Sequence, residues 1–342
     1  MKVSVIVPAY NIESYIGRCL ESIIRQKIND IEIIVVNDGS TDNTLEIVKD
    51  YRGKYSNIKI IDKKNEGSIE ARKSGLTKAR GEYILFIDGD DWIEDNTINL
   101  LYKKAKKNCA DIVLYNGYWA YDDYKKILRS FNINEDIKSS PLISLFMNHI
   151  NPGIVFKFIK REYINKNQIM FPENISFAED LATSASLFMH NPKIEVVNNS
   201  LYNYYQRSTS ISKQVSDKIL DVDKAIEFIR EQLIINSIYD EIEKEFERMV
   251  YTHMFSERIL GAEKLYSVHK SLYIKYKSRN IKVNQNIYLN KLIKEKYFFD
   301  KIRIKCYLIN YDLGRIYDCL KTIIKKFLLI DNWKIRRDSL WE

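Results

Sequence analysis

The chain has 342 residues, 45% of them hydrophobic and 29% charged, enough to bury the core of one large domain and a smaller one. Its net charge of +8 fits nucleic acid, anionic lipid or phosphorylated substrates, but equally a Lys-, Asn- and Ile-rich composition, because the basic residues are spread rather than blocked. No apolar run approaches the roughly 18 residues of a membrane span, and the first residues leave no room for the apolar core of a signal peptide, so we expect a cytoplasmic protein.

Predicted strands and helices alternate through the first half of the chain. Continuous apolar runs predict strands at 3–10, from 31, at 58–62, at 83–88 and at 110–116. Helical spacing of apolar residues predicts helices at 13–26, 44–55, 68–79 and 96–108, the second with Thr41 or Asp42 as its N-cap. Strands separated by helices of this length form βαβ units. We therefore predict an α/β domain with a mainly parallel sheet and helices on both faces.

The second half changes character after about residue 215, where Gly and Pro become rare and helical patterns dominate. We predict two regions, an α/β domain at 1–214 and a smaller helical C-terminal region at 215–342. No Pro- or Gly-rich linker separates them, which favours packing of one against the other.

The tail from 313 to 331 has the pattern of an amphipathic helix. Its apolar residues trace one face, and Trp333, Arg336 and Arg337 follow closely. One interpretation is that this face packs against the preceding helices or a second copy of the chain, giving a homo-oligomer. The other is peripheral contact with the inner face of the cell membrane, because a basic amphipathic helix can lie among anionic headgroups.

Three carboxylates crowd the end of a predicted buried strand in "YILFIDGDDW", residues 83–92. Asp88, Asp90 and Asp91 repel one another, and the run contains no Lys or Arg to neutralise them. Mg²⁺ or Mn²⁺ would supply the positive charge, since such a cation takes one or two carboxylates and fills its shell with water and phosphate oxygens. The alternative is a surface turn, because Asp-Gly at 38–39 and 88–89 is also a turn signature.

Other ligand-binding patterns are missing from the sequence. The four cysteines form no CxxC pair and the four histidines lack metal-ligand spacing, so zinc is not expected. Neither GxGxxG nor GxxxxGK[ST] occurs, which argues against a dinucleotide-dependent dehydrogenase and a P-loop NTPase. Tyr10, Asp38 and Asp88 sit at the carboxyl ends of predicted strands, where open α/β sheets bind ligands.

Five segments carry a resemblance to a known family. They are, in chain order, "VSVIVPAYN", "IIVVNDGSTD", "NEGSIEARKSG", "GEYILFIDGDD" and "FAEDL". Together they resemble the motifs of the family-two inverting glycosyltransferases of the GT-A (Rossmann-like) fold, over roughly residues 1 to 212. The likeness is to bacterial enzymes that build capsule, lipopolysaccharide or wall polymers. It implies a nucleotide-sugar donor such as a UDP-sugar, a divalent metal, a glycan or lipid-linked acceptor, and no nucleic acid.

The resemblance also implies roles for individual residues. Positions matching the nucleotide contacts of the family are Pro8, Ala9 and Tyr10 around the base, Asp38 at the uracil imide, and Asn65 and Arg72. Lys73 departs from the usual Ala-Arg-Asn. Within the DxD motif, Asp88 matches a ribose or metal contact, Gly89 the middle position and Asp90 the direct metal ligand, with Asp91 in support.

Asp180 matches the catalytic base, and Arg207 lies in a segment that often faces the phosphates or the acceptor. An inverting transfer needs one carboxylate to take the proton of the attacking hydroxyl, and a metal stabilises the departing diphosphate without a second acid. Taken alone, Glu179 and Asp180 could simply begin a helix, where carboxylates favour the dipole.

Two other functions remain open at this point. A sugar-phosphate nucleotidyltransferase would carry a Gly-rich loop after the first strand, which "PAYNIESYIG" does not supply. A non-catalytic nucleotide-sugar-binding protein on a decayed transferase fold is disfavoured by intact Asp90 and Asp180.

Overall fold

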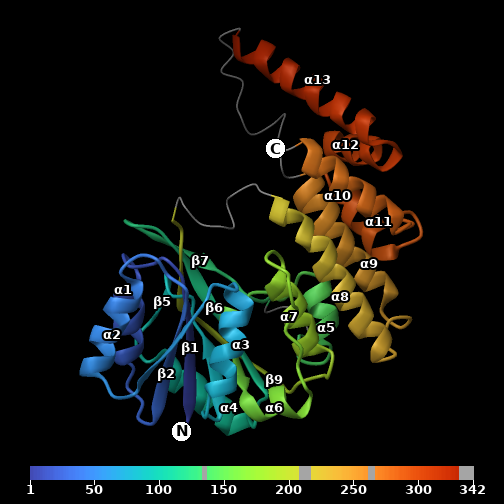
Figure 1. Cartoon of the computed structure of the whole chain (residues 1–342). Helices are drawn as coiled ribbons and strands as arrows, with labels where there is room; N and C mark the ends of the chain where they lie inside the picture. Colours follow the sequence, from blue (N-terminus) through green and yellow to red (C-terminus); the bar gives the residue numbers. More distant parts are fainter. Residues whose placement is uncertain (133–136, 208–216, 261–265, 331–342) are drawn as a thin grey trace. The chain divides into compact units, whose positions relative to one another are not determined.

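The computed structural model describes residues 1–132, 137–207, 217–260 and 266–330, which form two compact units, Met1–Ile242 and Glu243–Glu342 (Figure 1). The boundary expected at 214/215 falls outside the described residues, as do Trp333, Arg336 and Arg337 of the tail. The first unit ends with a helix of its own, α8 (Asp221–Ile235), which packs against α7 (Glu179–Phe188).

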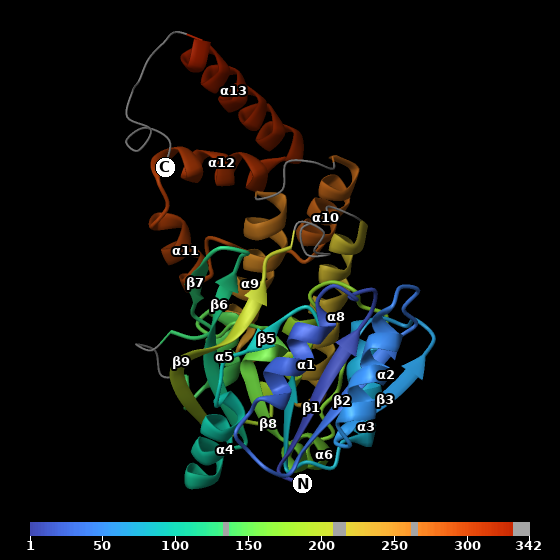
Figure 2. The same cartoon turned by 90° about the vertical axis from the view of Figure 1, so that its left-hand side faces the viewer.

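One sheet forms the centre of the first unit, with strand order β3-β2-β1-β4-β8-β6-β9-β5 and β7 paired to β6. Its first four strands in the chain are parallel: β1 (Val3–Ala9), β2 (Ile31–Asp38), β3 (Ile58–Lys63) and β4 (Tyr83–Phe86). Figure 2 shows β1, β2 and β3 side by side. The others are β5 (Trp92–Ile93), β6 (Ile112–Ala120), β7 (Lys125–Leu128), β8 (Lys157–Lys160) and β9 (Ile194–Tyr205).

Helices cover both faces of the parallel strands, and β1, β2 and β4 are therefore buried on both sides, whereas the edge strand β3 is only partly buried. Helix α3 (Ser68–Lys78) packs on β1 and β2, while α1 (Ile16–Ile24) and α2 (Thr44–Lys54) lie together on the other side (Figure 1). The remaining helical segments are α4 (Thr97–Asn108), α5 (Pro141–Phe146), the 3₁₀ turns η1 (Ile154–Phe156) and η3 (Asp217–Leu220), and α6 (Arg161–Lys166). The predicted α/β fold is confirmed.

The structure adds two details to the predicted elements. Beyond β4 the sheet is mixed, because β8 runs antiparallel to both β4 and β6. Helix α2 begins at Thr44 with Asn43 as its N-cap, rather than Thr41 or Asp42. The Asp42 carboxylate instead accepts from the amides of Thr44 and Glu13, which joins this turn to the start of α1.

Strand register brings the candidate residues to one edge of the sheet. Ala9 at the end of β1 pairs with Asn37, and Ile6 pairs with Phe86 at the end of β4. Because these strands are parallel, the residues that follow them emerge at the same carboxyl edge. Tyr10, Asp38 and Asp88 therefore share this edge, as predicted.

The second unit is helical in its described residues. Its elements are α9 (Glu243–Val250), the π-helical η4 (Tyr251–Ile259), α10 (Tyr266–Ser278), α11 (Ile287–Lys294), α12 (Phe298–Ile309) and α13 (Tyr311–Ile330). Stacked and edge-on rings of Tyr251, Phe255, Tyr276 and Tyr307 form its core. Within the described ranges, no helix combines the length and apolarity that a bilayer crossing requires.

Candidate active site

Asp91 anchors the acidic loop that follows β4. Its side chain is completely buried; Oδ2 accepts from the Tyr202 hydroxyl at 2.6 Å and Oδ1 from the Tyr205 amide at 2.7 Å. The Tyr202 hydroxyl also accepts from the Asp88 amide at 3.2 Å. Burial, followed by the charges of Asp90 and Asp88, raises the pKa of Asp91 well above its usual value. Asp91 thus joins the loop to β9, consistent with a supporting role.

Close packing explains why glycine follows Asp38 and Asp88. A Cβ at Gly89 would lie 2.3 Å from Ile12 Cδ1, and one at Gly39, where φ is +72°, would lie 2.7 Å from the Asn65 amide nitrogen. Asp38 itself is buried. Both Asp-Gly pairs are therefore packed parts of the site, unlike the exposed turns considered as an alternative.

Asp90 lies at the open side of the loop, with one fifth of its side chain exposed. Arg207 Nε lies 3.0 Å from Oδ2 of Asp90, and Arg18 donates to the Asp90 carbonyl at 3.1 Å. Burial and the neighbouring Asp88 raise the pKa of Asp90, while Arg207 opposes the rise. The positive charge missing from the local sequence thus comes partly from distant arginines.

The Arg18 guanidinium lies against two neighbouring rings, with its carbon 3.7 Å from the centroid of Trp92 and 4.5 Å from that of Tyr205. This cation–π stack fixes the donor that meets the loop backbone. Sequence reasoning missed Arg18, and its local pattern carries no signal, since an arginine off the apolar face of a helix is ordinary.

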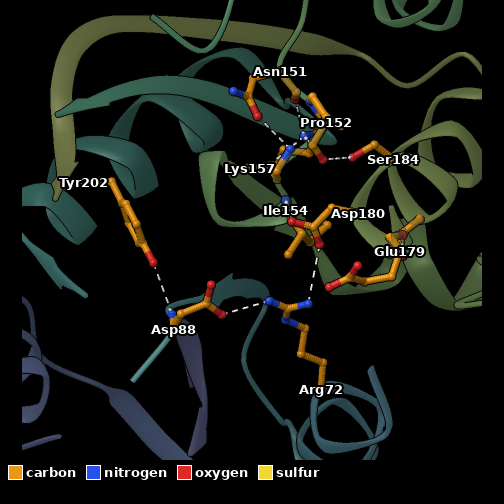
Figure 3. A network of polar contacts seen from close by, with 12 residues as sticks. Arg72, Asp88, Asn151, Pro152, Ile154, Lys157, Glu179, Asp180, Ser184 and Tyr202 are labelled. Atoms are coloured by element: carbon orange, nitrogen blue, oxygen red, sulfur yellow. Dashed lines mark hydrogen bonds and ion pairs between the residues drawn. The ribbon is translucent and has the colours of Figure 1, made fainter. Parts of the chain in front are cut away.

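Arg72 connects the acidic loop to the candidate base (Figure 3). It is nearly buried; Nη2 donates to Asp88 Oδ1 at 2.8 Å, and Nη1 lies 3.4 Å from Asp180 Oδ1. Burial alone would lower the pKa of Arg72, but the two carboxylates outweigh it and hold the pKa above its usual value. One guanidinium therefore sets the spacing of two of the predicted site residues.

Asp180 stands in the first turn of α7, after the left-handed Ala178. Its Oδ2 accepts from the Ile154 amide at 3.3 Å, and its side chain is 30% exposed. Burial raises its pKa, opposed by Arg72, and burial together with Asp180 raises the pKa of Glu179. A partly exposed carboxylate with a raised pKa suits a general base, although it also begins a helix as the alternative proposed.

The predicted nucleotide contacts come from several elements: Pro8, Ala9 and Tyr10 at the end of β1, Asp38 at the end of β2, Asn65 after β3, Arg72 on α3 and Arg207 after β9. Asp38 accepts from the amides of Glu66 at 3.0 Å and Gly67 at 2.8 Å, which shapes the turn before α3. Tyr10 and Asn65 are exposed, whereas Pro8 is partly buried and Ala9 is buried. Lys73, at the position of the family's Asn, donates to Glu70 and Glu173.

The carboxylates fit a divalent cation that shares its shell with a ligand. Among the residues that the structure describes, no three His, Cys, Asp or Glu side chains are arranged as a metal cage. Mg²⁺ needs only one or two carboxylates when phosphates and waters complete the octahedron. Asp90 and Asp88 provide such a pair, since Arg207 and Arg72 each engage one oxygen of one carboxylate.

Lys157 was also missed by sequence reasoning. It is completely buried beside the loop that contacts Asp180, with its charge inside the apolar run "IVFKFI". A lysine within a buried strand rarely lacks partners, so this interruption was the available signal.

An α/β fold with a mixed sheet, an acidic loop at the carboxyl edge of its parallel strands and Asp180 opposite that loop define a protein of the GT-A class. The model of the family described as "Glycosyl transferase family 2" matches residues 4–167. The chain is 33% identical over 227 residues to "Glycosyltransferase GlyG" of Streptococcus pneumoniae, covering 63% of this chain and 74% of that protein. The chain therefore belongs to glycosyltransferase family 2.

Two further comparisons bear on length and fold. "Uncharacterized glycosyltransferase EpsJ" of Bacillus subtilis is 32% identical over 216 residues, which cover 62% of this chain and 63% of that protein, so the chain spans less than two thirds of it. The crystal structure of S. aureus TarS 1-349 in complex with UDP-GlcNAc has a TM-score of 0.68 and 22% identity, covering 93% of this chain and 90% of that one. This likeness supports the fold.

Proposed function

We propose that this chain is a metal-dependent inverting glycosyltransferase that moves a sugar from a UDP-sugar to a hydroxyl of a glycan or lipid-linked acceptor in surface polysaccharide synthesis. The observation that carries the proposal is the shared guanidinium of Arg72, which pairs with both Asp88, a proposed donor contact, and Asp180, the proposed base. The UDP-GlcNAc complex of the structurally similar TarS supports the choice of a UDP-sugar.

The chemistry assigned to the chain's own residues is a single displacement. Asp180 takes the proton of the acceptor hydroxyl as its oxygen bonds to the anomeric carbon and the bond to the diphosphate breaks. Asp90, with Asp88, would hold Mn²⁺ or Mg²⁺, which when bound stabilises charge on the leaving diphosphate. Pro8, Ala9, Tyr10, Asp38, Asn65, Arg72 and Arg207 are the proposed contacts to the nucleotide sugar.

Replacing the base tests this assignment. We expect Asp180→Asn to lower transfer by about 10²-fold or more while UDP still stabilises the protein in a thermal-shift assay with Mn²⁺. Glu179→Gln, the same change at the adjacent carboxylate, is the matched control and should retain most activity. Normal transfer by Asp180→Asn would assign the base to another residue. Absence of both transfer and metal-dependent donor hydrolysis in the unmodified chain would favour a non-catalytic sugar-binding protein.

We also propose a cytoplasmic location with peripheral contact of α13 to the inner face of the cell membrane. Leu313, Ile316 and Leu320 on this helix are 39–56% exposed, and Ile323 and Ile324 continue the apolar stripe. The +8 net charge of the chain favours an anionic bilayer. An acceptor carried on a lipid would make this contact useful.

Co-sedimentation with phosphatidylserine vesicles tests the membrane contact. The unmodified chain should pellet at low salt, and Leu320→Gln with Ile323→Gln should pellet less. If both proteins pellet equally, the helix is not the membrane contact. If the substitutions instead change the oligomeric state in solution, the stripe packs on a second copy.

A further inference from the structure

Lys157, the first residue of β8, occupies an unusual environment for a lysine (Figure 3). Its side chain is completely buried, and its ammonium lies at 3.0, 3.1 and 2.8 Å from the carbonyl oxygens of Asn151, Pro152 and Gly153. Three consecutive carbonyls thus converge on one nitrogen. Lysine is almost never fully buried without partners, and here backbone dipoles supply them.

The arrangement matches the charged form of the side chain. An ammonium has three N–H donors for the three carbonyls, whereas a neutral amine would have only two. Burial lowers the pKa of Lys157 to about 7, and the negative charge of Asp180 opposes this shift. The ammonium is therefore the form of Lys157 that can donate a hydrogen bond to each of the three carbonyl oxygens.

The same loop contacts α7 at two points. Because its carbonyls turn toward Lys157, the amide of Ile154 is left to donate to Asp180 Oδ2 at 3.3 Å. From the next turn of α7, the Ser184 hydroxyl donates to the Pro152 carbonyl at 2.5 Å. Asp180 and Ser184 are four residues apart and so lie on one face of the helix. The loop is clamped between Lys157 and this face.

We propose that Lys157 is a positioning residue for Asp180: its ammonium gathers the carbonyls of residues 151–153 so that the Ile154 amide meets the carboxylate. Arg72 then holds the other oxygen, Oδ1, from α3. A carboxylate fixed at both oxygens keeps the orientation that proton transfer from an acceptor hydroxyl requires. This inference rests on the proposed role of Asp180 as the base.

The positioning has a consequence for the pH dependence of transfer. Four charged groups face Asp180: Arg72 from α3, Asp88 after β4, Glu179 on α7, and Lys157 on β8. Both the charge of Lys157 and the Ile154 hydrogen bond lower the pKa of Asp180. Loss of the Lys157 charge and of the Ile154 hydrogen bond therefore raises the pKa of Asp180. Asp180 is then protonated, and inactive as a base, up to a higher pH.

The test is the pH profile of kcat/KM for Lys157→Met, which keeps the length of the side chain but removes its charge. We expect the acidic limb to move to higher pH by about one unit, so that kcat/KM falls about tenfold on that limb. The KM for the UDP-sugar should stay within about twofold, because the nucleotide contacts are not altered. The two profiles should converge at alkaline pH, where the wild-type lysine also loses its proton.

Phe158→Leu is the matched structural control. This ring, next along β8, is fully buried and stacks on Tyr83 at 4.9 Å. The substitution should lower thermal stability without moving the acidic limb. A loss of activity in Lys157→Met with an unmoved limb, or an unchanged kcat, would overturn the positioning role.

A second variant covers the case in which Lys157→Met does not fold. Ile154→Pro removes the amide proton, together with part of a fully buried side chain, and the position suits proline because it begins η1 and follows Gly153 at φ −51°, ψ 121°. It should move the limb in the same direction, and an unmoved limb in this variant also contradicts the inference. If Asp180→Asn retains transfer, the assignment of Asp180 as the base fails instead, whatever the two loop variants show.

Discussion

Substituting Tyr202 by Phe tests whether the buried Asp91 depends on its tyrosine. The hydroxyl makes two contacts, donating to the Asp91 carboxylate at 2.6 Å and accepting from the Asp88 amide at 3.2 Å. A hydrogen bond to a charged group contributes about 1.5–3 kcal/mol, and a buried amide left unpaired costs about 1–3 kcal/mol. Because the second contact is long, we expect a total loss of about 3–4 kcal/mol, or roughly 10 °C in Tm.

Tyr83→Phe provides the control for this measurement. It deletes the same group from another buried ring, whose hydroxyl donates to the neutral Ala110 carbonyl at 3.1 Å. A neutral bond of this kind contributes about 1 kcal/mol, so the Tyr83 variant should lose about a third as much stability in urea or thermal unfolding. Equal losses in the two variants would refute the special role of the charged acceptor.

The pH dependence of the Tyr202→Phe loss adds a second check. Burial raises the pKa of Asp91 in the folded state, so stability falls as pH rises from the unfolded pKa through the folded one. Removing the donated hydrogen bond raises the folded pKa further. The stability gap between wild type and variant should therefore widen with rising pH. A gap that is constant with pH would mean that Asp91 is not the acceptor that matters.

Three further predictions concern the metal, the arginine stack and the sheet. Asp90→Ala should abolish donor turnover, and EDTA should do the same to the unmodified protein; full activity in EDTA would contradict metal dependence. Arg18→Lys should lower the free energy of unfolding by about 1 kcal/mol, because ammonium cannot reproduce the planar stack, and unchanged urea denaturation would argue against it. Gly81→Ala should lower the free energy of unfolding by about 2–3 kcal/mol, because its Cβ would lie 2.3 Å from the Ser4 nitrogen. Gly53→Ala, in open space on α2, should slightly stabilise the protein. Similar Tm changes in the two variants would contradict this prediction.

Local sequence patterns predicted the fold and the location of the site. Apolar runs and helical spacing are properties of neighbouring residues, and they identified the βαβ units whose strand ends carry Asp38 and Asp88. The ordered motifs added Asp90 and Asp180, whose roles stay predictions. The N-cap of α2 is Asn43, one residue beyond the prediction, although the Asp42 carboxylate still accepts from the amide of Thr44, the first residue of the helix.

Tertiary structure decided how the three carboxylates differ. Their sequence, Asp-Gly-Asp-Asp, does not reveal that Asp91 is buried against Tyr202, a residue 111 positions away, or that Arg18 meets the Asp90 carbonyl from 72 positions away. Arg72 meets Asp180 across 108 positions. Charges and hydrogen-bond partners interact through space over a few ångströms. Residues that are far apart in the sequence can therefore form such a pair without any local sequence pattern that predicts it. Burial is the largest cause of the raised pKa of Asp91, and burial exists only once the sheet has formed.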